Sequence, residues 1–310
     1  MRGNTTFPRY AKAGGPHLRV KDGLRLPPVM RSTHYPRCGK TNVSMKKITL
    51  LAFSFLSVTV LAEPPAKIDV SRLPKESRVV DDVIVPVPSE IFGVLDKLGK
   101  PNWAGVLRPL KGVAKPFGEP QQQALYLGSV IAEGFIAVEA GDVAEVKNIG
   151  NSVLSLSGAL GVRKAVTKRA NAIINAADAG NWQLVRKELD GALNEVKDAM
   201  TELGSGDLAS LVSLGGWLRG TEALCEVVVK NYSKDGADLL HQPALLDHFD
   251  SRLGSLKARA KKHPLVPKIQ AGLKNIRPFI GLTDGTEISA KSVKEVRDIS
   301  SGLVKDIQTK

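Results

Sequence analysis

The sequence predicts an all-α protein, a multi-helix bundle of about nine helices that an extended, proline-rich segment precedes. Two observations lead to this fold class. Apolar residues recur at three- and four-residue steps from about residue 89 almost to the end of the chain. Gly, Asp, Asn and Ser stand where these periodic stretches begin and end, as expected of helix caps. No stretch of the sequence predicts a convincing sheet.

A stretch inside the N-terminal part of the chain has the pattern of a secretory signal peptide. Met45-Lys46-Lys47 is a short positive region, Ile48 to Leu61 is uncharged and apolar, and Ala62 offers a small residue for cleavage. The apolar run is shorter than the roughly 20 residues of a transmembrane helix. We therefore expect export to the periplasm or secretion, with cleavage after Ala62 and no stable membrane span afterwards.

Residues 1–44 differ from the rest of the chain because they contain nine Lys or Arg residues and one acid, Asp22. They have no helical or strand period, which predicts a disordered basic extension that is absent from the mature protein or not translated at all. An organellar presequence and a basic cytoplasmic tail remain open as alternatives.

The charge of the whole chain is misleading about its partners. The formal net charge is +13, and residues 1–62 carry eleven basic residues and one acid, or +10, which leaves +3 for the mature part. Most of the basic charge therefore lies in the predicted leader. We expect no nucleic-acid partner; the predicted partner is an unknown protein or envelope component.

The mature part is predicted to begin with an extended segment, residues 63–88, in which prolines interrupt short β-branched runs. The helical domain spans residues 89–310, with a helical period almost throughout after Pro101. The last helix is expected to start with a capping box formed by Ser292 and Glu295. The nine predicted helices cover residues 89–98, 120–140, 143–159, 162–179, 184–203, 208–231, 244–256, 265–276 and 293–307.

Two helix joints resemble each other, which suggests stacked α-hairpins. Each ends one helix with Gly, at Gly141 and Gly180, and caps the next with Asp142 or Asn181. The joint Ala179-Gly180-Asn181-Trp182 resembles joints of tetratricopeptide-type proteins. The large and small residues do not recur at a 34-residue period, however, so the sequence does not predict membership of that family. Convergence of short helix connections explains the two joints equally well.

The sequence predicts an ion pair between two nearly uncharged helical stretches. Glu133 is the single charge in residues 124–138, and Arg219 is the single charge in residues 208–220. Because an unpaired buried charge is costly, we expect them to pair, with Gly216 and Gly220 permitting close helix contact. The pair is either structural or, together with Trp217, the polar floor of a ligand-binding pocket.

Other candidate groups carry weaker signals. His241, Asp247, His248 and Asp250 are dense in potential metal ligands, but their spacing does not secure a common face, and we expect no metal site and no cofactor. Cys225 is the only cysteine of the mature part and lies among apolar residues, which predicts a buried, unreactive thiol. The chain has no phosphate loop, nucleophile elbow, His-Glu-x-x-His or paired Cys-x-x-Cys motif.

Basic side chains are concentrated at two places in the helical domain. Both clusters are solvated helix faces or contacts for an anionic surface such as lipid headgroups, cell-wall polymers or an acidic partner. Few aromatic residues interleave with them, which argues against base stacking. The first cluster is Arg163, Lys164, Lys168 and Arg169, and the second is Lys257, Arg259, Lys261 and Lys262.

Two functions of different classes follow from these patterns. The favoured one is an exported binding or scaffold protein without enzymatic activity, because the chain has an apparent signal and no catalytic motif. The alternative is a hydrolase or lyase of the cell envelope whose carboxylates converge in a helical cavity. A cavity shared by Glu133, Arg219 and Trp217 would favour the enzyme.

Overall fold

The computed structural model describes residues 79–80, 83–84, 93, 101–281, 283 and 285–309. The chain divides into two units, Met1–Glu63 and Pro64–Lys310, and every described residue belongs to the second. The predicted basic extension and signal peptide lie outside the described residues, as do most of the extended segment 63–88 and of the helix predicted for residues 89–98.

The predicted all-α bundle of about nine helices is confirmed. Within residues 63–88, the described residues form a short ribbon in which β1 (Val79–Val80) pairs antiparallel with β2 (Val83–Ile84). One turn of 3-10 helix, η2, covers Trp103–Gly105. The α-helices are α2 (Pro120–Glu139), α3 (Val143–Ala159), α4 (Arg163–Asp178), α5 (Trp182–Glu202), α6 (Gly206–Lys230), α7 (Lys234–Asp238), α8 (Pro243–Ser255), α9 (Ala258–Lys261), α10 (Leu265–Ile280) and α11 (Ala290–Gln308).

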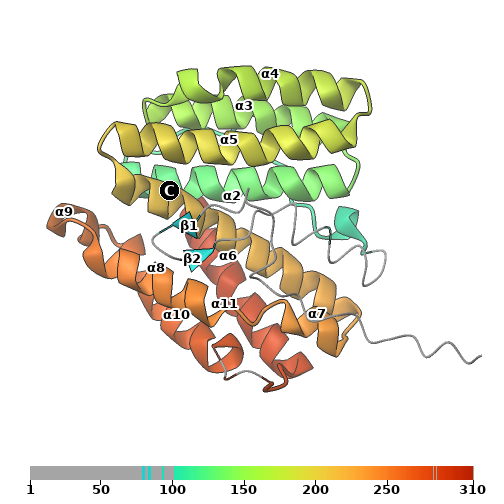
Figure 1. The fold of residues 1–310 in the computed structure, drawn as a ribbon, viewed down its shortest axis with the longest axis vertical. Coiled ribbons are helices and arrows are strands. Elements are labelled where there is room, and N and C mark those ends of the chain that lie inside the picture. Colours follow the sequence, from blue (N-terminus) through green and yellow to red (C-terminus); the bar gives the residue numbers. More distant parts are fainter. Residues whose placement is uncertain are drawn as a thin grey trace, which may run out of the picture. The chain divides into compact units, whose positions relative to one another are not determined.

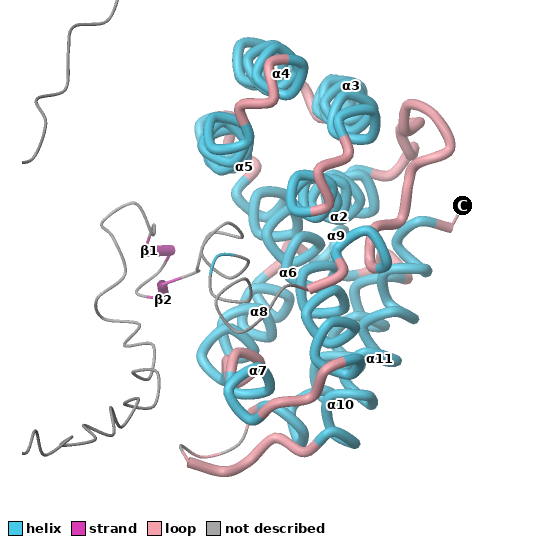
Figure 2. Tube along the Cα trace, turned by 90° about the vertical axis from the view of Figure 1, so that its right-hand side faces the viewer, coloured by secondary structure: helices cyan, strands magenta, loops and turns pink. Residues whose placement is uncertain are grey.

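Helices α2 to α5 form an antiparallel four-helix bundle, which Figure 1 shows from the side and Figure 2 nearly end-on. Short turns join them, and each turn ends its helix with a glycine at positive φ, such as Gly141 (69°) and Gly180 (66°). The predicted caps are confirmed: the side chain of Asp142 accepts from the backbone N–H of Glu145, and that of Asn181 from Leu184.

Helix α6 joins this bundle to the remaining helices. It crosses α2 with the largest helix contact of the described chain, and α11 packs on its other side. Helix α10 packs on α11, and α8 contacts both α10 and α6. Helix α6 is consequently surrounded, which explains why its sequence is apolar nearly all round.

Several details differ from the sequence prediction, which also did not include the short helices α7 and α9. Helix α11 is capped by Ser289, whose side chain accepts from the N–H of Ser292, so the proposed Ser292 and Glu295 capping box is wrong. Helix α10 continues through Pro278 to Ile280. Residues 106–118 are not helical but extended along the bundle, because Pro109, Gly112 and Pro116 interrupt the helical period there. We call residues 106–118 the docked segment.

None of the described helices is both long enough and apolar enough to cross a membrane. This finding covers the part of the chain from α2 to α11. The apolar run of the predicted signal peptide lies outside it.

Candidate functional site

Glu133 and Arg219 face each other across the crossing of α2 and α6. Arg219 Nε donates to Glu133 Oε2 at 2.6 Å, and both side chains are almost completely buried. The pairing that the sequence predicted is therefore present. Its role in ligand binding stays a prediction.

Glycines bring the two helices close enough for this pairing, and one of them, Gly216, is a glycine that the sequence indicated. A Cβ atom on Gly128 would lie 1.9 Å from the carbonyl oxygen of Val212, and one on Gly215 would lie 2.0 Å from that of Leu125. Gly216 also lies at the crossing, because a Cβ on Gly128 would lie 2.8 Å from its backbone nitrogen, whereas a Cβ on Gly220 would meet nothing within 4 Å. The prediction for Gly220 is therefore wrong: that position faces away from the crossing.

The pair belongs to a larger network that the sequence did not reveal. Arg108 of the docked segment contacts Glu222 through Nη1 at 2.6 Å and Glu226 through Nη2 at 2.9 Å. Glu222 is completely buried, and its second oxygen lies 3.4 Å from Arg219 Nη1. We call these five residues, Arg108, Glu133, Arg219, Glu222 and Glu226, the buried charge network. Glu222 and Glu226 follow Arg219 at helical spacing, whereas Arg108 reaches them only because the docked segment lies along the bundle.

The same charges hold the backbone of the docked segment. The backbone N–H of Arg108 donates to Glu133 Oε1 at 2.6 Å, and Arg219 Nη2 donates to the carbonyl oxygen of Val106 at 2.8 Å. Glu133 thus accepts from a backbone amide and from a guanidinium, while Arg219 bridges α2, α6 and the docked segment. Buried backbone groups outside regular structure need such partners.

Polar side chains of α2 and α3 continue this pattern along the docked segment. Leu110 N–H donates to Glu145 at 2.8 Å, Ala114 N–H to Ser152 at 2.9 Å, and Phe117 N–H to Gln123 at 2.7 Å. Asn148 and Ser155 donate to carbonyl oxygens of the segment. Buried polar residues in this part of the molecule therefore satisfy an irregular piece of chain.

Trp217, the third residue of the predicted site, lies elsewhere. Its indole N–H donates to Gln242 Oε1 at 2.8 Å, and its ring packs at 5.5 Å from that of Phe249 in α8. Two positions along a helix separate it from Arg219, so the two side chains point to different neighbours. The structure joins Glu133 with Arg219 and places Trp217 between α6 and α8.

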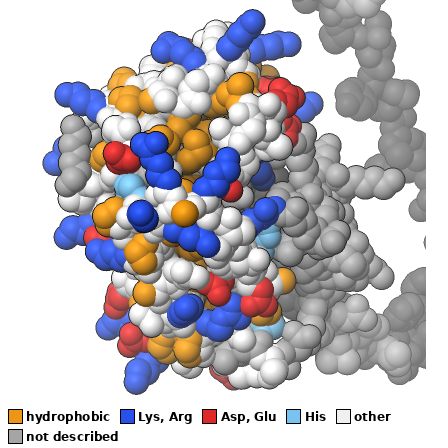
Figure 3. All heavy atoms as spheres, turned by 90° about the vertical axis from the view of Figure 1, so that its left-hand side faces the viewer, with side chains coloured by type: hydrophobic (Ala, Val, Ile, Leu, Met, Phe, Trp, Pro, Cys, Tyr) orange, Lys and Arg blue, Asp and Glu red, His pale blue; other side chains and the backbone are white. Residues whose placement is uncertain are grey.

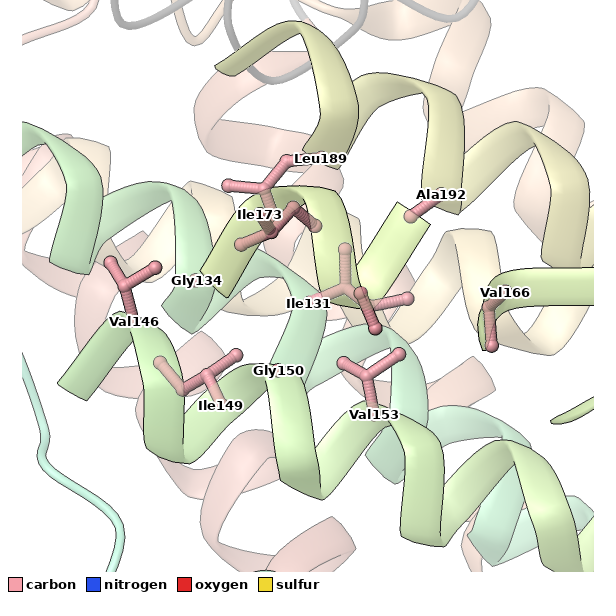
Figure 4. Close-up of a pocket in the computed structure, with 11 residues that line it drawn as sticks. Ile131, Gly134, Val146, Ile149, Gly150, Val153, Val166, Ile173, Leu189 and Ala192 are labelled. Carbon is pink, nitrogen blue, oxygen red and sulfur yellow. The ribbon is translucent and has the colours of Figure 1, made fainter. Parts of the chain in front are cut away.

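The centre of the four-helix bundle contains a small apolar void (Figure 4). Its volume is about 10 Å³, room for about one water molecule, whereas ligand pockets occupy roughly 300–1,000 Å³. All four helices contribute to it. Its lining consists of Ile131, Gly134, Val146, Ile149, Gly150, Val153, Val166, Ala170, Ile173, Leu189 and Ala192.

His248 and Cys225 are both buried. Burial, and secondarily the charge of Lys197, lowers the pKa of His248, whose ring packs edge-on against Phe249. No three His, Cys, Asp or Glu side chains among the described residues converge as they would on a metal ion. Cys225 is buried, as predicted, and burial raises the pKa of its thiol, which keeps it protonated.

The two basic clusters lie at the same end of the four-helix bundle. Arg163 and Lys164 begin α4, and the three-residue turn between α4 and α5 makes these helices antiparallel, so the start of α4 lies beside the end of α5. The second cluster adjoins that end, because the backbone N–H of Lys257 donates to Asp207 in the first turn of α6. Figure 3 looks onto this end and shows Lys and Arg side chains spread over it.

Seven of the eight basic side chains are exposed and form no ion pair with a described residue. The exception is Arg169, which bonds Glu188 and Glu195 of α5, both at 2.9 Å. We call the remaining set the basic end. It consists of Arg163, Lys164, Lys168, Lys257, Arg259, Lys261 and Lys262.

Comparison with known proteins finds no match: no family model, no curated protein and no solved structure is significantly similar to the chain. Two features of the described structure bear on function, the buried charge network and the basic end.

Proposed function

We propose that this is an exported, non-enzymatic helical binding or scaffold protein that contacts an anionic component of the cell envelope through the basic end. The observation that carries the proposal is that seven exposed basic side chains without ion-pair partners among the described residues lie at one end of the bundle. Unpaired like charges on one surface repel each other, and an anionic partner relieves that repulsion.

The contacts of the buried polar groups favour a binding site on the outer surface of the protein over one in its interior. Glu133, Arg219 and Glu145 are already bonded to one another or to the docked segment. The void in the four-helix bundle is too small for a ligand and lacks polar side chains. A binding role therefore fits the exposed surface better.

The alternative, an envelope hydrolase or lyase, draws less support from the same contacts. A general acid or base has to reach substrate, and it needs a free proton-transfer position. Glu133 accepts three bonds from Arg108 N–H and Arg219, and Trp217 is not beside it. We therefore favour a role that needs no catalytic carboxylate.

Fractionation of native cells tests the proposal. We expect a soluble envelope product whose N-terminal sequence starts at Glu63 and whose mass lacks residues 1–62. This product should sediment with crude envelope material at low salt and leave it as salt rises, because exposed charges are screened. A cytoplasmic product that retains residues 1–44, or envelope binding that salt does not weaken, would refute it.

A further inference from the structure

We propose that the basic end binds the surface of an anionic phospholipid bilayer, with Leu203 inserted among the lipid headgroups. This inference rests on the proposed function and names the partner of the same surface. Leu203 is 62% exposed, the largest exposure of any large apolar side chain in the described chain. It follows directly on α5, at the end where α4 begins.

The position of Leu203 relates it to both basic clusters. Lys257 is tied to Asp207, four residues after Leu203, so the second cluster lies beside the turn between α5 and α6. Arg163 and Lys164 begin the helix that runs antiparallel to α5. Figure 3 shows apolar side chains between the Lys and Arg side chains of this face.

The combination favours a lipid surface over a charged polymer. Lys and Arg near an anionic membrane each contribute about 1 kcal/mol of binding free energy, and an apolar side chain among them gains energy only when it leaves water. An anionic polysaccharide or polyphosphate would contact the charges but leave Leu203 exposed. Glu202 ends α5 and Asp207 lies in the first turn of α6; they reduce the positive charge of the end but do not cancel seven basic residues.

The opposite end of the four-helix bundle provides an internal contrast. Its turns contain Ala140 and Ala179 where the basic end has Leu160 and Leu203, and Asp142 and Asn181 follow their glycines. Glu139 and Asp178 at that end are paired with Arg186 and Lys147. The opposite end has an exposed leucine of its own, Leu184 at 37% in the first turn of α5, but Leu203 at 62% is more exposed. Leu203 also lies at the end that holds seven exposed basic residues without an ion-pair partner among the described residues.

Vesicle sedimentation with protein purified from cells, its N-terminus determined by mass, tests the inference. We expect binding to vesicles of phosphatidylglycerol and phosphatidylcholine, and little to phosphatidylcholine alone. Changing Lys257, Arg259, Lys261 and Lys262 to Gln should weaken binding by roughly several hundredfold, at roughly fivefold per residue. The matched control changes four exposed basic residues elsewhere, Lys187, Lys274, Lys291 and Lys294, to Gln and should retain most of the binding.

Leu203→Ala separates a bilayer from a polymer. It should weaken vesicle binding by roughly tenfold and leave its salt dependence unchanged, because it removes apolar contact but no charge. Its circular dichroism and melting should match the unchanged protein, since the side chain is exposed.

Three other results would each overturn a different part of the two proposals. The lipid inference would be overturned if the protein bound dextran sulfate, did so equally well after Leu203→Ala, and did not bind anionic vesicles. The proposed function would then stand. Equal losses for both quadruple variants would overturn the assignment to the basic end. Binding to neither probe would overturn both proposals.

Discussion

The α2–α6 crossing and the centre of the four-helix bundle are both buried, yet they are built differently. At the crossing, glycine backbones nearly touch, and charged side chains of α2 and α6 bind the docked segment through its backbone and through Arg108. In the bundle centre, aliphatic side chains from four helices meet around a small void. Helices satisfy their own backbone groups and need only apolar neighbours, whereas the docked segment brings unsatisfied amides and carbonyls that require buried polar partners.

The largest expected effect comes from breaking the buried charge network. Arg219→Met should lower the free energy of unfolding by about 3–5 kcal/mol, because it leaves Glu133 and Glu222 buried without their common partner. Urea denaturation measures it. The matched change Arg163→Met, at an exposed position of α4, should stay within about 0.5 kcal/mol. Equal stabilities of the two variants would show that the network contributes nothing.

A smaller loss of stability is expected when one methyl group is added at the helix crossing. Gly128→Ala places a Cβ atom against the carbonyl oxygen of Val212, which forces α2 and α6 apart at a cost of about 3 kcal/mol. Gly220→Ala is the control, since its Cβ meets nothing within 4 Å and alanine favours the helix. Thermal melting of both variants compares them. A Gly128→Ala protein as stable as the control would disprove the close approach of the two helices.

The smallest effect on stability, a gain and not a loss, is expected from a substitution in the centre of the four-helix bundle. A Cβ on Gly150 would lie 3.5 Å from Ile174, an ordinary contact, and Gly150 lines the void. Gly150→Ala should therefore raise the free energy of unfolding by about 0.5–1 kcal/mol, since alanine costs less backbone entropy in a helix. Urea denaturation should show a higher midpoint with an unchanged slope. A loss of stability would mean that this centre is as tightly packed as the crossing.

The sequence by itself determined the elements whose cause is local. The 3.6-residue period of α5 and α11, and the Gly and Asp or Asn caps of the turns before α3 and α5, depend on neighbouring residues, so they could be predicted before the fold was known. The pairing of Glu133 with Arg219 could also be predicted, because each is the single charge of an apolar stretch, residues 124–138 and 208–220, and such charges need partners. The burial of Cys225 could also be predicted, because the residues next to it in the sequence are apolar.

Only the tertiary structure decided which groups meet across long sequence separations. Gly128 and Gly215, not Gly220, lie at the crossing because the direction in which each glycine faces depends on how the two helices rotate against each other. Arg108 joins Glu222 because a proline- and glycine-interrupted segment lies along the bundle, which no local period specifies. The two basic clusters share an end because the turn between α4 and α5 reverses the chain and α9 returns beside α6. Caps and periods arise from interactions within a few residues, whereas these contacts arise from packing between whole helices.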